Sequence, residues 1–164
     1  MSFAKQMIIG LFCLFSMTSI LQGQKYTVMT YNIRMETPQD GVDQWQYRKD
    51  ALVKNIQNVS PDFLGIQEGL LQQMQFMDTE LEQYDFIGVG RDDGASRGEY
   101  NALFYDASKW SVVETNTFWL SETPGKVSMG WDAACNRVCT NGLFTNGKGD
   151  TIGVFNTHLD HQGK

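Results

Sequence analysis

The chain has 164 residues, of which 13 are basic, 19 are acidic and 2 are histidines, so its formal net charge at pH 7 is −6. An acidic surface repels polyphosphate at long range, so tight, non-specific binding to nucleic acid is not expected. The length is enough for one domain with its own hydrophobic core, and we find no internal repeat and no low-complexity segment.

The first 23 residues have the features of an export signal. Lys5 gives a short positive region, and an almost wholly apolar run follows from Met7 to Ile20. That run is short for a membrane span, so we expect cleavage after Gly23 and a mature chain, residues 24–164, that is periplasmic or extracellular. An uncleaved anchor is the alternative. Processing would leave 12 basic and 19 acidic residues, a net charge of −7, and no stable membrane span.

Hydrophobic residues recur at helical spacing in residues 47–59 and 70–81, and we predict helices there. Strands are predicted, in chain order, at residues 25–33, 63–67, 84–89, 100–105, 112–120, 137–145 and 150–156. Asn146-Gly147 predicts a hairpin between the last two strands. Helices alternate with strands early and strands follow strands later, which predicts an α/β (α+β) domain of two packed β-sheets flanked by helices. The aromatic content of the strands predicts that both faces of each sheet are covered.

Polar side chains lie at or near the C-terminal ends of three predicted strands. Asn32, Glu68 and His158 are the central examples, and α/β sheets usually place their binding sites at such ends. An amide, a carboxylate and an imidazole brought together suit a divalent metal ion held beside a phosphate. Each residue also has a structural alternative, as a turn asparagine, a helix-capping glutamate or a core histidine. A carboxylate after a buried strand is costly unless it is paired or metal-bound, which favours a metal role for Glu68.

Further residues are candidates for supporting roles. His158 could orient or protonate a phosphoryl oxygen, and Asp160 could fix the tautomer of its imidazole. Asn101 and Arg137 are candidate substrate contacts because an amide and a guanidinium both bind phosphate oxygens. An ion pair with Asp132 is an equal alternative for Arg137.

The two cysteines of the mature chain, Cys135 and Cys139, suit either a disulfide in an exported protein or two buried thiols. Zinc normally needs four ligands, so neither this pair nor His158 with His161 is a strong indication of zinc. The loop 91–98 lacks the strand–glycine–helix context of a phosphate-binding P-loop. Four tryptophans could line a ligand groove, although large aromatic residues mostly serve burial; they are Trp45, Trp110, Trp119 and Trp131.

Four motifs, taken in order, resemble the endonuclease/exonuclease/phosphatase family of metal-dependent phosphoesterases, most closely its exported bacterial branch. They are Thr-Tyr-Asn-Ile-Arg at 30–34, Gln-Glu at 67–68, Gly-Glu-Tyr-Asn-Ala-Leu-Phe-Tyr at 98–105, and Asn-Thr-His-Leu-Asp-His at 156–161. The resemblance implies a site at one end of the packed sheets. It also implies that Glu68 and Asn32 bind Mg²⁺, or Mn²⁺ in its place, and that Asn32 and His158 contact the scissile phosphate. The implied reaction is attack of water on the phosphorus of a phosphoester whose class is not specified.

The resemblance also has a large departure. The family pattern continues with Gly-Asp-x-Asn and Ser-Asp-His segments, which position the nucleophile and supply the base, and neither segment occurs in this chain. We therefore expect residues 24–164 to form an incomplete four-layer sandwich, truncated before its C-terminal motifs, and to be an inactive fragment of a phosphodiesterase, phosphatase or nuclease-like hydrolase. An exported ligand-binding module without catalysis is the alternative.

Overall fold

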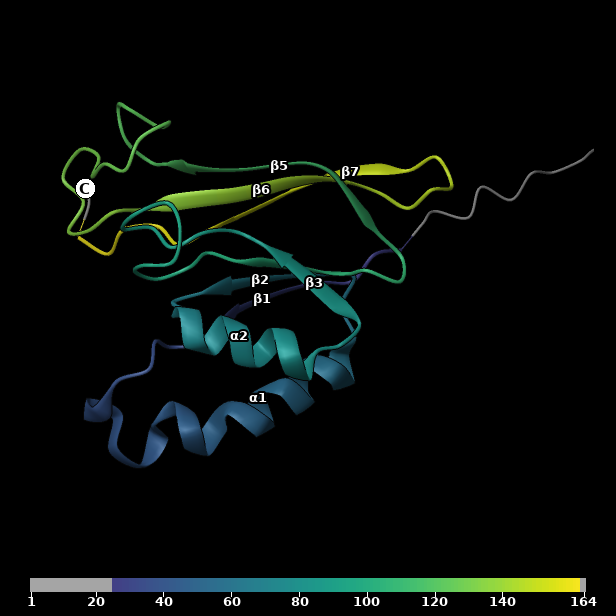
Figure 1. The fold of residues 1–164 in the computed structure, drawn as a ribbon, viewed down its shortest axis with the longest axis horizontal. Helices are drawn as coiled ribbons and strands as arrows, with labels where there is room; N and C mark the ends of the chain where they lie inside the picture. Colours follow the sequence, from purple (N-terminus) through teal and green to yellow (C-terminus); the bar gives the residue numbers. More distant parts are fainter. Residues whose placement is uncertain (1–24, 163–164) are drawn as a thin grey trace, which may run out of the picture.

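The computed structural model describes residues 25–162, and their strands form two sheets packed face to face (Figure 1). The elements are, in chain order, β1 (Val28–Asn32), the 3-10 helix η1 (Pro38–Asp43), α1 (Trp45–Val59), β2 (Phe63–Gln67), α2 (Leu71–Glu80), β3 (Tyr84–Ile87), β4 (Leu103–Asp106), β5 (Ser111–Trp119), β6 (Val138–Thr145) and β7 (Thr151–Thr157). The predicted α/β class, with two packed sheets flanked by helices, is confirmed. The predicted export signal lies outside the described residues.

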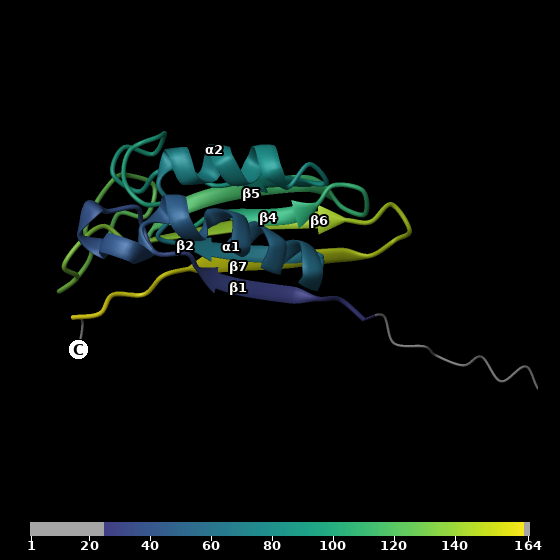
Figure 2. The ribbon, with the colours of Figure 1, turned by 90° about the horizontal axis from the view of Figure 1, so that it is seen from below.

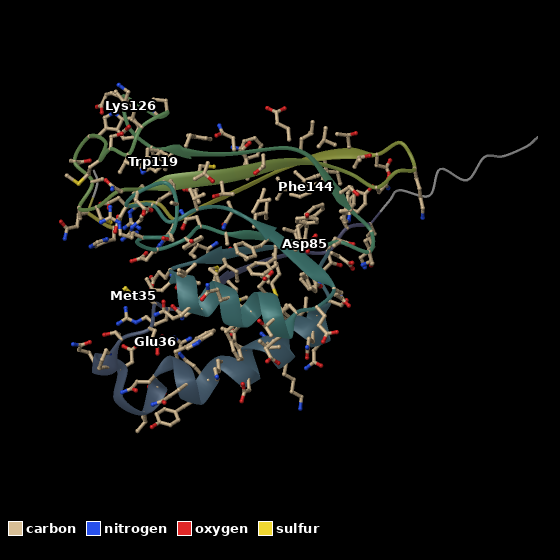
Figure 3. The ribbon with its side chains drawn as sticks, viewed as in Figure 1. Met35, Glu36, Asp85, Trp119, Lys126 and Phe144 are labelled. Atoms are coloured by element: carbon tan, nitrogen blue, oxygen red, sulfur yellow. The ribbon has the colours of Figure 1, made fainter. Side chains whose placement is uncertain are left out.

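The first sheet has the strand order β1-β2-β4-β3 and is mixed, whereas the second, β5-β6-β7, is antiparallel. β2 is buried along its whole length because it has a core on each face. Leu64 and Ile66 pack in the core beside the helices, and Phe63 packs in the core between the sheets. The ring of Phe63 lies 5.0 Å from that of Phe144 in β6, and Figure 3 shows Phe144 between the two sheets. Burying each such side chain contributes about 2 kcal/mol.

Both helices cover the outer face of the first sheet (Figure 2). α1 buries Leu52, Val53 and Ile56, which recur at helical spacing, and α2 buries Met74 and Met77 completely. These two methionines therefore belong to the core. Between residues 25 and 162, no helix combines the length and apolar character needed to cross a bilayer.

The outer face of the second sheet differs from the sequence-based prediction. Within the described part of the chain no helix covers it (Figure 1), and β7 alternates between exposed and more buried residues. Val113 of β5 is 59% exposed and Phe155 of β7 is 70% exposed. The expectation that both faces of each sheet are covered is thus wrong for this sheet, where the described residues form three layers.

Asp62 ties the start of the first sheet to the turn after β4, and this contact gives a pH-dependent prediction. Its carboxylate accepts hydrogen bonds from the Thr27 N–H at 2.8 Å and from Lys109 Nζ at 3.1 Å. Burial acts to raise the pKa of Asp62, but these hydrogen bonds and the lysine charge outweigh burial and lower the pKa overall. A carboxyl group with a lowered pKa in the folded state stabilises the fold above its unfolded-state pKa of about 4, and this stabilisation is lost as the pH falls through the folded-state pKa.

We therefore expect Asp62→Asn to lower the free energy of unfolding at pH 7, and the deficit to shrink as the pH falls below about 4. Urea denaturation of both proteins at a series of pH values measures the deficit. A deficit that stays constant from neutral to strongly acidic pH would show that the Asp62 carboxylate does not act through its charge.

Candidate active site

The segments that the sequence analysis selected gather at one end of the two sheets. β1, β2 and β7 all run toward this end, and the loops that follow β1, β3 and β5 lie there too (Figures 1 and 2). Met35 and Trp119, which flank this region, lie at the same end in Figure 3. The N-terminal start of the described chain and the β6–β7 hairpin lie at the opposite end (Figure 1).

The first sheet contributes one wall of the site, where Glu68 lies beside Asn32. Asn32 ends β1 and Glu68 directly follows β2, its parallel neighbour. Asn32 Nδ2 donates a hydrogen bond of 2.9 Å to Glu68 Oε1, and the Met35 N–H donates one of 3.4 Å to Glu68 Oε2. The backbone of Glu68 is left-handed, with φ of +62°, a conformation that costs a residue with a side chain about 1 kcal/mol or more and that concentrates at functional sites.

The environment of Glu68 favours its ionised form. Partial burial acts to raise the pKa of Glu68, but the hydrogen bonds from Asn32 and Met35, followed by the positive charges of His158 in its protonated form and of Arg34, outweigh burial and lower the pKa overall. Because a lowered pKa keeps a carboxyl group ionised at neutral pH, Glu68 is a carboxylate under physiological conditions. It is therefore in the state that binds a cation.

The loop after β1 is held in place by one residue from each helix. Gln73 of α2 is fully buried; its side-chain oxygen accepts from the Glu36 N–H at 3.0 Å, and its amide nitrogen donates to the Arg34 carbonyl at 3.1 Å. Arg48 of α1 donates to the carbonyls of Ile33 and Arg34. The loop that supplies the Met35 N–H to Glu68 is thus fixed by the helices, and the site does not depend on a free loop.

Arg137, His158 and His161 form the opposite wall, which the second sheet contributes. Arg137 precedes β6 and is 6% exposed; its Nε donates to Asp160 Oδ1 at 3.0 Å. Its Nη1 lies 3.4 Å from His158 Nδ1, and its Nη2 lies 3.2 Å from His161 Nδ1. A guanidinium group has only donors, so both Nδ1 atoms act as acceptors. A neutral His158 then carries its proton on Nε2, where it can donate to a ligand.

The two walls enclose a cleft of about 260 Å³. Its lining residues are Arg34, Met35, Glu68, Arg91, Glu99, Cys135, Arg137, His158 and His161. Three guanidinium groups therefore face two carboxylates, so the cleft is more cationic than the acidic chain as a whole. Asn32 lies beside Glu68 and lines a neighbouring hollow of about 580 Å³ between β1 and α1.

Arg91 and Glu99 also line the cleft, and the sequence analysis did not select them. They close the loop after β3 through a two-fold ion pair, with N–O distances of 2.8 and 2.9 Å, and through a hydrogen bond from the Arg91 N–H to the Glu99 carbonyl. The opposite charges at the two ends of the loop were the overlooked signal.

The structure gives two predicted site residues a different position from the one expected. Asn101 is 4% exposed, and its amide donates to the Val138 carbonyl at 2.7 Å. It joins the two sheets and is not among the residues that line the cleft. Asp160 was expected to fix the tautomer of His158. In the structure the Asp160 carboxylate pairs with Arg137, and the Arg137 guanidinium is the group that contacts His158 Nδ1.

The cysteines are separate thiols, so the disulfide alternative is not what the structure holds. Cys139 is buried within β6, where its thiol contacts the Thr140 carbonyl and burial raises the pKa of the thiol. Cys135 belongs to the loop before β6 and lines the cleft.

The oxygen atoms at Glu68 and Asn32 fit a hard cation. Each Glu68 oxygen accepts one hydrogen bond, and Asn32 Oδ1 accepts one from the Arg34 N–H at 3.0 Å, so each oxygen keeps a lone pair. Within residues 25–162, no three His, Cys, Asp or Glu side chains cluster to bind a metal. A Mg²⁺ site does not require such a cluster, because Mg²⁺ usually keeps several waters and binds one or two carboxylates together with substrate phosphate.

The comparison with protein families supports the same class of site. The model of the endonuclease/exonuclease/phosphatase family matches residues 29–157. The chain therefore belongs to this family, whose members generally depend on a divalent metal.

Similar proteins include two solved structures from Bacteroides species and a viral sequence relative. An endonuclease/exonuclease/phosphatase of Bacteroides vulgatus is 44% identical with a TM-score of 0.78, over 83% of this chain and 52% of that one. A mannosyl-6-phosphatase of Bacteroides thetaiotaomicron is 41% identical with a TM-score of 0.82, over 85% of this chain and 54% of that one. An uncharacterised protein of Acanthamoeba polyphaga mimivirus is 27% identical over 127 residues, which are 73% of this chain and 47% of that protein. The chain thus spans about half the length of these proteins.

Proposed function

We propose that the chain contributes to the active site of an exported, metal-dependent phosphoesterase that hydrolyses phosphorylated sugars. The observation that supports this most strongly is the pairing of two unlike walls in one cleft. The Glu68 carboxylate, which accepts a hydrogen bond from Asn32, lies on one wall, and Arg137 with His158 lies on the other. Anionic oxygen on one side and cationic donors on the other suit a cation bridged to a phosphoryl group.

In this proposal, Glu68 and Asn32 hold Mg²⁺, or Mn²⁺ in its place. When bound, the cation would neutralise charge on the phosphoryl oxygens and lower the pKa of a bound water. His158 donates its Nε2 proton to a phosphoryl oxygen, and Arg137 keeps that imidazole in the donating tautomer. Water attacks phosphorus, the ester P–O bond breaks, and the leaving alcohol takes up the proton that the attacking water loses, so that phosphate and a free alcohol are released.

Two considerations support a sugar phosphate as the substrate. A relative of 41% identity is a mannosyl-6-phosphatase, and the net charge of −6 disfavours a long polyanion. We propose that this chain by itself binds the cation and the substrate without measurable turnover. The cleft has two carboxylates, and Glu99 forms an ion pair with Arg91. Among the described residues, Glu68 is therefore the cleft carboxylate that has no ion-pair partner.

Substitution of Arg137 by lysine tests the phosphate side of the proposal. An ammonium group cannot contact Asp160 and both imidazoles at once, so we expect the affinity for inorganic phosphate, measured by calorimetry in Mg²⁺, to fall about tenfold. Arg97→Lys is the matched control, because the Arg97 side chain is 77% exposed and pairs only with Asp93 among described charges. Equal phosphate affinity in wild type and Arg137→Lys would contradict the proposal. A phosphate affinity that is unchanged when a chelator removes the metal would favour a metal-independent binding module.

A further inference from the structure

Trp131 departs from the other tryptophans of the chain. Trp45, Trp110 and Trp119 are at most 7% exposed, whereas Trp131 is 73% exposed. The Trp119 indole N–H donates to the Arg91 carbonyl at 2.8 Å, and Trp45 and Trp110 pack against other aromatic rings. Between residues 25 and 162, no ring or cation stacks on Trp131. An indole left in water is a large apolar surface without a partner in the fold.

The backbone holds Trp131 in a costly conformation. Its φ is +48°, a left-handed value that is unusual for a bulky residue. The neighbouring chain allows little adjustment, because a Cβ at Gly130 would lie 2.2 Å from the Leu120 carbonyl oxygen. The Ala134 N–H donates to Asp160 Oδ1 at 3.2 Å, which anchors the loop to the site. Strain that burial does not offset points to a functional constraint on the position of this ring.

Trp131 lines a hollow of about 200 Å³ that adjoins the proposed phosphate cleft. Arg137 belongs to the walls of both. The hollow combines apolar walls, from Trp131 and Leu159, with the carboxylates of Asp132 and Asp160. Carboxylates accept hydrogen bonds from hydroxyl groups and repel a second phosphate. A flat apolar ring beside hydroxyl acceptors matches a sugar ring, which presents C–H groups on its face and hydroxyl groups at its edge.

We infer that Trp131 is the platform on which the sugar ring of a phosphorylated sugar lies while its phosphate occupies the cleft at Arg137 and His158. This inference rests on the proposed function, because it takes the phosphate position from that proposal. It adds a specificity-determining residue and a subsite for the part of the substrate that is not phosphate.

Tryptophan fluorescence of the chain tests the inference directly, because the three buried tryptophans are shielded from acrylamide. The probes are inorganic phosphate, adenosine monophosphate and the 6-phosphonate analogue of mannose 6-phosphate, which has no ester bond to hydrolyse. We expect the sugar phosphonate to lower the quenching of Trp131 and inorganic phosphate to leave it unchanged. Trp131→Ala should weaken binding of the sugar phosphonate about fivefold to tenfold and leave phosphate affinity unchanged. Tyr47→Ala is the matched control, since Tyr47 is 68% exposed on α1 and lines neither cavity.

The outcomes separate the inference from the proposed function. If phosphate binds but the sugar phosphonate binds no tighter and leaves Trp131 fully quenched, the platform is wrong and the phosphate site stands. If adenosine monophosphate shields Trp131 as well as the sugar phosphonate does, the platform does not distinguish a hexose from a nucleoside and the inference fails. If the wild-type chain binds no phosphate in Mg²⁺, the proposed function and the inference both fail.

Discussion

Replacing Glu68 with glutamine is expected to lower the affinity for Mn²⁺ or Mg²⁺ about 100-fold or more. Glutamine has nearly the same shape as glutamate and retains one acceptor oxygen, but it lacks the negative charge that Glu68 carries in the folded protein. The Asn32 amide and the Met35 N–H each donate to one Glu68 oxygen, so glutamine keeps one of these two hydrogen bonds, and the largest loss is the charge that attracts the cation. Titration calorimetry with each metal measures the effect.

Glu114→Gln provides the matched control for this experiment. Glu114 is exposed on β5, outside the cleft, and the same change of charge there should leave metal affinity within about twofold, since a distant exposed charge is largely screened. If Glu68→Gln and Glu114→Gln weaken metal binding equally, the effect would reflect the net charge of the chain and Glu68 would not be a ligand.

Replacing Asn156 with alanine is expected to lower the free energy of unfolding by about 3 kcal/mol. Asn156 is 6% exposed on β7, and its amide nitrogen donates to the carbonyls of Ile66 and Ala102 at 2.8 Å each. Its amide oxygen accepts from Gln67 Nε2 at 2.7 Å. Alanine would leave three buried polar groups of the first sheet without these partners. Urea denaturation with an unchanged m-value would show a loss of stability alone.

Two further variants make the Asn156 prediction specific. Asn116→Ala on the exposed part of β5 is expected to change stability by less than about 0.5 kcal/mol. Gly65→Ala should destabilise the wild type, because its new methyl group would lie 2.7 Å from Asn156 Oδ1. It should destabilise the Asn156→Ala protein less, since that side chain is gone. Additive effects in this double-mutant cycle would contradict the proposed contact between the sheets.

Local patterns in the sequence were sufficient to predict the two α-helices and the strands of the fold, but not the 3-10 helix η1. Strand β2 lies at its predicted residues, 63–67, because a short apolar run between a proline and a glutamate has few alternatives. The Asn146-Gly147 turn joins β6 to β7 as predicted, because its left-handed glycine, with φ of +67°, fixes the hairpin. The uncovered face of the second sheet was not predicted, because strand composition does not show which of two faces meets a helix.

Contacts between distant residues decide which of the candidate site residues the structure brings together. Asn32 and Glu68 lie together because parallel strands end at the same edge of a sheet, and this could be expected from the sequence. Asn101 and Arg137 have equally suitable chemistry, yet one bridges the sheets and the other lines the cleft. That distinction depends on how the second sheet packs on the first, which no local pattern encodes. Trp131 was grouped with the core tryptophans for the same reason.

The most direct test of the proposed site uses the two histidines, which are the only ones in the sequence and which both line the cleft opposite Glu68. The measurement is paramagnetic broadening by Mn²⁺ of the imidazole signals in a ¹H–¹⁵N spectrum of the untagged chain. We predict that sub-stoichiometric Mn²⁺ broadens the signals of His158 and His161 in the wild type, and that Glu68→Gln abolishes the broadening at the same Mn²⁺ concentration. Histidine signals that stay sharp in the wild type, or that broaden equally in Glu68→Gln, would contradict a cation site at Glu68 on the wall that faces His158.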